Sequence, residues 1–163
     1  MFRRYRGLAG LFLVALLASC AGVKYSPVVT EQKSIPDVSV IVSYQADGIY
    51  QVQVVSDLPG MISLLWNSSA YVNTGGDAVR LIHIPDVDNF PDLAPVTQAS
   101  STIARGAKFK TYFVGESWID YARRGVTPRP KDSESKASIY LAFNIKDKKV
   151  YWKGEVSFVP VKQ

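Results

Sequence analysis

Apolar and polar side chains alternate with a period of two along much of the chain from residue 37 onward. In one clear example, Ile139, Leu141 and Phe143 are interleaved with Ser138 and Tyr140. Successive side chains of a β-strand point to opposite faces of a sheet, so this alternation predicts half-buried strands. Strands are predicted in this way at residues 38–44, 50–54, 62–66, 70–72, 79–83, 108–114, 138–145 and 150–159.

Turn-forming pairs separate several of these segments. Asp47-Gly48, a favoured hairpin pair, stands between the first two segments, Pro59-Gly60 precedes the third, and Asp147-Lys148 precedes the last. Two longer stretches, 85–101 and 115–136, are predicted to be loops, and no stretch of the domain has a helical period. The pattern predicts an all-β domain, an antiparallel immunoglobulin-like β-sandwich of about seven or eight strands, with a small closed β-barrel as the alternative.

The first twenty residues follow a different pattern. Arg3, Arg4 and Arg6 form a basic head, and residues 8–18 (LAGLFLVALLA) carry no polar side chain. A membrane-spanning helix needs about 20 apolar residues, so this run is too short to remain as a transmembrane anchor. A basic head followed by a short apolar run is typical of a secretory signal, predicted here at residues 1–19.

The sequence LASC at Leu17–Cys20 ends this run, and it resembles the lipobox of bacterial lipoproteins. The resemblance implies cleavage between Ser19 and Cys20 and a covalent lipid on the Cys20 sulfur. In enteric bacteria, an aspartate directly after the cysteine retains lipoproteins in the inner membrane. The resemblance therefore implies that Ala21 favours the outer membrane, with the domain facing the periplasm. The alternative, an unmodified thiol, has no second cysteine with which to pair.

Processing would leave residues 20–163. We expect residues 20–36, which contain two prolines and no clean period, to be a lipidated N-terminus and flexible tether, and residues 37–163 to be the β domain. Three of the nineteen basic residues leave with the signal, so the mature charge is +2 rather than +5. This small charge gives little support to nucleic-acid binding.

A second, weaker resemblance lies at residues 66–83 (WNSSAYVNTGGDAVRLIH). This stretch resembles a strand–turn–strand pattern of small, poorly characterised β-sandwich envelope lipoproteins, a resemblance that implies no activity. In physical terms, we expect Trp66 to fill the core, Asn67 and Ser68 to bend the chain between sheets, and Arg80 to pair with a carboxylate of a neighbouring strand.

Side chains that could support catalysis or metal binding are sparse. His83 is the sole histidine and shares a strand face with Val79 and Leu81, which favours a hydrogen-bonded structural role over a catalytic base. The acidic loop DVDNFPD at 86–92 lacks the glycine and the ligand number of a calcium loop. The sequence therefore predicts no enzyme activity, no metal, and no cofactor apart from the lipid on Cys20.

The loop at 115–137 contains the side chains best suited to binding a partner. Tryptophan, tyrosine and arginine are the commonest anchors of protein interfaces. The candidate partner-binding residues are Trp118, Tyr121, Arg123, Arg124 and Arg129. In the alternative interpretation, Trp118 and Tyr121 fold back and cover one end of the sandwich.

We therefore expect a lipid-anchored, non-catalytic envelope protein that binds another envelope protein as an accessory or assembly factor. Two alternatives remain open at this stage. The first is a periplasmic lipoprotein that binds a small molecule or glycan, which would need a hollow lined by aromatic side chains. The second is a prophage or plasmid exclusion lipoprotein.

Overall fold

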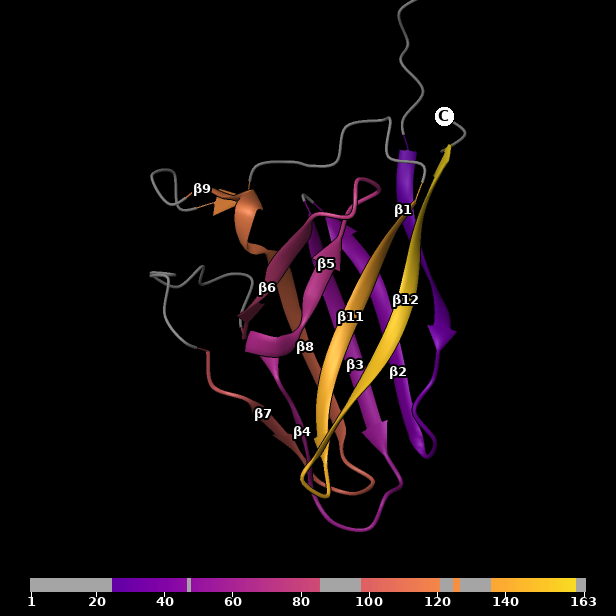
Figure 1. Ribbon diagram of the computed structural model, residues 1–163, viewed down its shortest axis with the longest axis vertical. Helices are drawn as coiled ribbons and strands as arrows, with labels where there is room; N and C mark the ends of the chain where they lie inside the picture. Colours follow the sequence, from indigo (N-terminus) through magenta and orange to yellow (C-terminus); the bar gives the residue numbers. More distant parts are fainter. Residues whose placement is uncertain (1–24, 47, 86–97, 121–124, 127–135, 161–163) are drawn as a thin grey trace, which may run out of the picture.

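The computed structural model describes residues 25–46, 48–85, 98–120, 125–126 and 136–160. This part of the chain is all-β, as the alternation predicts (Figure 1). The strands are β1 (Tyr25–Lys33), β2 (Val38–Ala46), β3 (Ile49–Ser56), β4 (Ile62–Leu64), β5 (Ala70–Val72), β6 (Ala78–Ile84), β7 (Ser101–Ile103), β8 (Lys108–Gly115), β9 (Ile119–Asp120), β10 (Gly125–Val126), β11 (Lys136–Ile145) and β12 (Lys148–Pro160). Two single 3-10 turns, η1 (Trp66–Ser68) and η2 (Glu116–Trp118), interrupt them.

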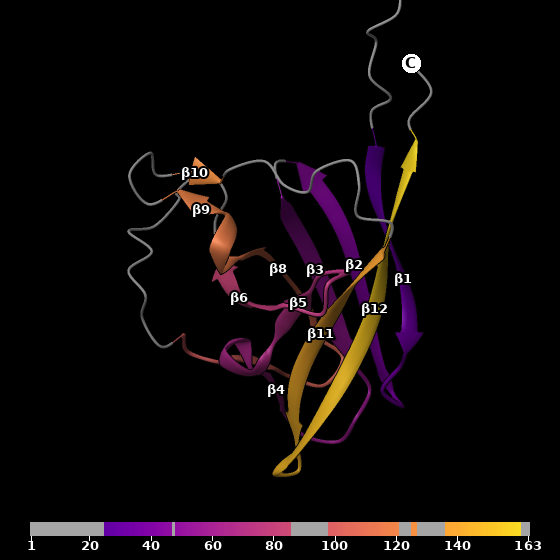
Figure 2. The ribbon, with the colours of Figure 1, turned by 45° about the horizontal axis from the view of Figure 1, so that its top comes forward.

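Ten of the strands form one antiparallel sheet: eight follow the order β1-β12-β11-β5-β6-β8-β3-β2, and β4 and β7 lie off this path. β4 pairs with both β11 and β7, and β9 and β10 form a separate two-stranded sheet. The sheet curves so strongly that its two end strands, β1 and β2, lie beside each other in both views (Figures 1 and 2). The predicted antiparallel all-β class is confirmed, and the nearly closed sheet is consistent with either a sandwich or a small barrel.

Two tight hairpins fix the register of the longest strands. Gly48, with φ 82°, makes the turn between β2 and β3, as expected from the Asp-Gly pair. Lys146 and Asp147 have φ of 49° and 59°, the left-handed pair that a two-residue hairpin turn requires. The turn between β11 and β12 therefore lies one residue earlier than the sequence indicates, and Lys148 begins β12.

β6 closes the sheet by changing its partner midway. Its first half pairs with β5, where Arg80 lies opposite Ala70, and its second half pairs with β8, where Leu81 lies opposite Gly115. Because the strand passes from one layer to the other at this point, Leu81 and Ile82 are both buried although they point to opposite faces.

β4 and β5 run along the same partner, β11, with η1 between them. The buried Ser69 bridges this interruption. Its hydroxyl donates to the Leu65 carbonyl at 2.9 Å and accepts the Ala142 backbone N–H at 3.0 Å, while the Leu65 N–H donates to the Ala142 carbonyl at 2.8 Å. One side chain thus replaces the ladder bond that the 3-10 turn removes.

The expectation of a flexible tether over residues 20–36 is wrong from Tyr25 onward, because residues 25–33 form β1 and pair with β12. Pro27 lies within this strand. A proline is tolerated because β1 is an end strand of the sheet, where no neighbour needs the missing N–H. Pro27 is buried and Val29 packs against the core, so the strand contributes to the domain.

Candidate functional site

Trp66, the first residue of η1, is fully buried and fills the core, as the sequence predicts. Its indole stacks on the imidazole of His83, with ring centroids 4.7 Å apart and an interplanar angle of 2°. The indole N–H donates to the Ser101 hydroxyl at 2.9 Å, which ties η1 to β7. The two ends of the WNSSAYVNTGGDAVRLIH stretch therefore meet in space.

His83 is held in place by a chain of polar contacts with neighbouring strands. Its Nε2 lies 2.7 Å from the Thr111 hydroxyl, which is also 3.3 Å from the Ile84 carbonyl. A carbonyl only accepts, so the hydroxyl donates to Ile84 and accepts a hydrogen bond from the protonated Nε2 of the neutral ring. Burial lowers the pKa of His83 below its ordinary value of 6.5, which keeps the ring neutral. These contacts support the structural role expected for His83.

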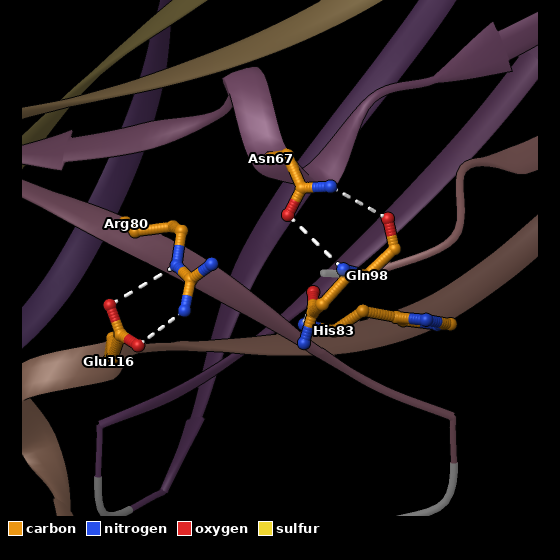
Figure 3. A network of polar contacts seen from close by, with 5 residues as sticks. All are labelled: Asn67, Arg80, His83, Gln98 and Glu116. Atoms are coloured by element: carbon orange, nitrogen blue, oxygen red, sulfur yellow. Dashed lines mark hydrogen bonds and ion pairs between the residues drawn. The ribbon is translucent and has the colours of Figure 1, made fainter. Parts of the chain in front are cut away.

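Asn67 and Gln98 form a reciprocal pair beside this histidine (Figure 3). The Asn67 amide donates to the Gln98 carbonyl at 2.9 Å, and the Asn67 side-chain oxygen accepts the Gln98 backbone N–H at 3.2 Å. The Gln98 side-chain oxygen accepts the His83 backbone N–H at 2.7 Å. Gln98 thus fixes η1, β6 and the approach to β7 to one another.

Arg80 pairs with a carboxylate as expected, but the carboxylate comes from η2 and not from a neighbouring strand. Its guanidinium makes a two-pronged contact with the Glu116 carboxylate, through Nε at 3.1 Å and through a second, shorter contact from Nη2 (Figure 3). Both side chains are about one-third exposed, at 31% and 32%. The pair clamps η2 onto β6 and fixes the entry to the segment that contains the predicted partner-binding residues.

Trp118, one of the candidate partner-binding residues, is buried. The side chain is only 5% exposed and meets the ring of Tyr71 edge-on, with centroids 4.8 Å apart. The Gly115 Cα lies directly beneath it, since a Cβ added there would be 2.9 Å from the indole. Trp118 therefore covers one end of the domain, as the alternative interpretation holds.

Several predicted residues lie outside the described part of the chain. They include the signal and lipidation residues Ser19 and Cys20 and the remaining candidate partner-binding residues Tyr121, Arg123, Arg124 and Arg129. The acidic loop at 86–92 also lies outside it.

A separate hollow of about 440 Å³ lies on the outer face of the sheet, where η1 and the end of β1 border β11 and β12. Its lining residues are Lys33, Ser68, Ala70, Tyr140, Tyr151 and Lys153. Tyr140 and Lys153 are a cross-strand pair, and so are Ala142 and Tyr151. The volume falls within the range of about 300–1,000 Å³ typical of small-molecule sites.

The hollow combines aromatic surface with positive charge. Lys153 Nζ lies 5.5 Å from the centroid of the Tyr140 ring, and the Tyr151 side chain is 39% exposed. Lys149 Nζ donates to the Ser68 hydroxyl at 3.0 Å, which brings another cation to the Ser68 side of the hollow. None of the lining residues is acidic. The arrangement suits a ligand that offers an anionic group to the lysines and a flat or apolar face to the tyrosines.

Sequence reasoning missed this hollow, although part of the signal was present. The alternation places Tyr140, Tyr151 and Lys153 on outward positions of two predicted strands. The walls come from Lys33 at the end of β1, within the predicted tether, and from Ser68 in η1, far away in sequence. Only the sheet order brings these segments together.

Helical structure in the described residues is confined to short turns, and none of it is long and apolar enough to cross a bilayer. Comparisons of the chain with protein-family models, with curated proteins and with solved structures found no match.

Proposed function

We propose that the protein is a lipid-anchored, non-catalytic lipoprotein of the bacterial envelope that binds an anionic small molecule or glycan. The hollow between Tyr140, Tyr151 and Lys153 is the observation that carries the binding role. The lipobox resemblance at Leu17–Cys20 supports the anchor, and Ala21 supports the outer membrane, with the domain facing the periplasm.

The chemistry of the hollow favours a saccharide that bears a phosphate or carboxylate. Aromatic faces pack against the apolar face of a sugar ring, while lysine ammonium groups attract an anion from any direction because they act as compact charges. Lys33 and Lys153 lie opposite each other on adjacent strands, so one anionic group can contact both.

A protein-partner role through residues 118–129 is the weaker alternative. Interface hot spots are aromatic or arginine side chains that become buried only on binding. Trp118 is already buried against Tyr71, so the strongest anchor proposed for that role is occupied within the domain.

The decisive experiment is an NMR titration of the full lipoprotein in detergent micelles. The probes are glucose 6-phosphate and glucuronic acid, with neutral glucose as the matched control ligand. We expect the anionic sugars to shift the amide signals of Tyr140, Tyr151 and Lys153 in a saturable way, and glucose to do so far more weakly.

Charge variants then test the assignment. Lys33→Ala combined with Lys153→Ala is expected to weaken binding of the anionic sugars about tenfold or more, which corresponds to about 1.4 kcal/mol. Lys108→Ala combined with Lys110→Ala removes two exposed lysines of β8 and is the matched control. Equal weakening by both pairs would show a general charge effect, and the absence of saturable shifts at the hollow would refute the proposed ligand class.

A further inference from the structure

The beginning of β1 and the end of β12 form an exposed apolar end of the domain. Tyr25 is 41% exposed, Val28 46% and Val159 41%. Val28 lies opposite Ser157 and Val159 opposite Ser26, so the two valines are diagonal neighbours on one face. Tyr25 pairs with Pro160 at the very end of the ladder. Three of the six large hydrophobic side chains exposed in the described residues therefore gather here.

The sequence places this apolar end close to the lipidation site. Tyr25 begins β1 five residues after Cys20. A fully extended chain spans at most about 3.6 Å per residue, so Tyr25 lies within about 18 Å of the Cys20 Cα. A lipid chain on Cys20 enters the bilayer, which keeps Tyr25 within about 18 Å of the membrane surface and lets it reach the headgroups.

We propose that this apolar end, formed by Tyr25, Val28, Val159 and Pro160, rests on the lipid bilayer. The inference builds on the proposed function, because it requires Cys20 to be lipidated. Tyrosine is enriched at membrane interfaces, where its ring lies among headgroups while its hydroxyl stays hydrated. Val28 and Val159 lie at the same end of the ladder but on its opposite face, and they remove apolar surface from water when they contact lipid.

Charges near the apolar end are compatible with this contact. Lys136 lies opposite Ser157 on the same face as the two valines, and its side chain is 67% exposed. Its ammonium group lies 3.3 Å from a Glu155 oxygen, so the neighbouring carboxylate is already neutralised. Lipid phosphates approaching Val159 would meet a neutral ion pair with an exposed ammonium group rather than an unpaired anion.

The contact would also orient the domain. β12 has 13 residues and rises about 3.3 Å per residue, so its Lys148 end lies roughly 40 Å from its Pro160 end. The connection between β3 and β4 lies at the far end as well (Figure 1). Met61, in that connection, is 72% exposed and is a matched apolar position remote from the proposed contact.

Site-directed fluorescence on the full lipoprotein tests the contact. Cys20 is the sole native cysteine, so lipidation leaves no native thiol and an introduced cysteine can be labelled selectively. Val28→Cys, Val159→Cys and the control Met61→Cys are each labelled with a polarity-sensitive dye and reconstituted into vesicles of phosphatidylethanolamine and phosphatidylglycerol. We expect blue-shifted emission and strong quenching by spin-labelled lipids at 28 and 159, and neither at 61.

Two checks separate the possible failures. Far-UV circular dichroism confirms that each variant is folded, and the mass of the N-terminal peptide reports whether Cys20 carries lipid. Lipidated protein with equal quenching at all three positions would overturn the membrane contact alone. An unlipidated Cys20 that reacts with maleimide would overturn both the contact and the proposed anchor.

Discussion

The indole of Trp66 and the imidazole of His83 stack in parallel, 4.7 Å apart, and join the 3-10 turn η1 to strand β6. Each ring also makes a polar contact with a third segment, Trp66 with Ser101 of β7 and His83 with Thr111 of β8. The stack is therefore the point at which four segments of the domain are fixed together. Its single titratable group is His83.

The stability of the domain is expected to depend on the ionisation of His83. Burial holds its folded-state pKa below the ordinary value of 6.5, to which it returns on unfolding. The unfolded chain therefore binds more protons than the folded one between these two values, so stability falls as the pH drops from about 6.5 to the folded pKa and then levels off. Urea unfolding at a series of pH values measures this decline.

His83→Gln is the control for that decline, because glutamine keeps a side chain that can contact Thr111 but does not titrate. The difference in pH dependence between the two proteins gives the contribution of His83 to stability, separate from that of the carboxylates. Because the chain has one histidine, a single imidazole signal in the NMR spectrum gives its pKa directly. A value at or above 6.5 would contradict the expectation.

Ser69→Ala is expected to destabilise the domain by about 1–3 kcal/mol, because it leaves the buried Ala142 N–H without its acceptor. The shift of the urea midpoint measures the loss. Ser39→Ala, on an exposed position of β2, is the matched control and should change stability by less than about 0.5 kcal/mol. Equal effects of the two substitutions would mean that Ser69 does not bridge the interruption between β4 and β5.

Gly115→Ala is expected to displace Trp118 from its place over Tyr71. The added Cβ would lie 2.9 Å from Cδ2 and 3.0 Å from Cε2 of the indole, which cannot bend away as a flexible side chain could. We expect a loss of about 1–3 kcal/mol and a more exposed indole.

Fluorine NMR of protein labelled with 5-fluorotryptophan measures this displacement, with Trp118→Phe used to assign the signal. The solvent isotope shift of Trp118 should increase, while those of the buried Trp66 and Trp152 stay the same. Ser117→Ala alters an exposed neighbour and should move none of the three signals. An unchanged Trp118 signal in Gly115→Ala would show that the position of the indole does not depend on the absence of a Cβ at residue 115.

Glu116→Gln is expected to cost about 1 kcal/mol, because it weakens a two-pronged, partly exposed pair with Arg80. Amide hydrogen exchange should accelerate at residues 116–119, since the pair clamps η2 onto β6. Glu155→Gln breaks the single contact to the more exposed Lys136 and should cost less. High salt should reduce both effects. A larger loss from Glu155→Gln would contradict this ranking.

The strands of the domain were predictable because burial repeats every second residue, as in Ile139, Leu141 and Phe143, which are all fully buried. β1 was missed since its inward residues, Pro27 and Val29, are too few to give a clear alternation and a proline usually argues against a strand. The partner change of β6 at Arg80 and Leu81 could not be predicted, because it depends on the sheet order and not on local preference.

The candidate site was less accessible to sequence reasoning than the fold. The role of Trp66 followed from its size, and that of His83 from its strand position. The sequence left the role of Trp118 open because a buried and an exposed tryptophan look alike in a loop, and only the bare Cα of Gly115 makes room for the buried one.

The pairing of β1 with β12 has a mechanical consequence. The chain enters the domain through β1, whose register with β12 runs through eight residue pairs from Tyr25 to Lys33. Antiparallel ladder bonds lie across the strands, so a pull along β1 from the chain ahead of Tyr25 strains many of them together. A sideways pull would instead open the ladder one pair at a time. If the protein is anchored at its N-terminus, a force applied along β1 loads the ladder in shear, the direction in which the pairing of β1 with β12 is strongest.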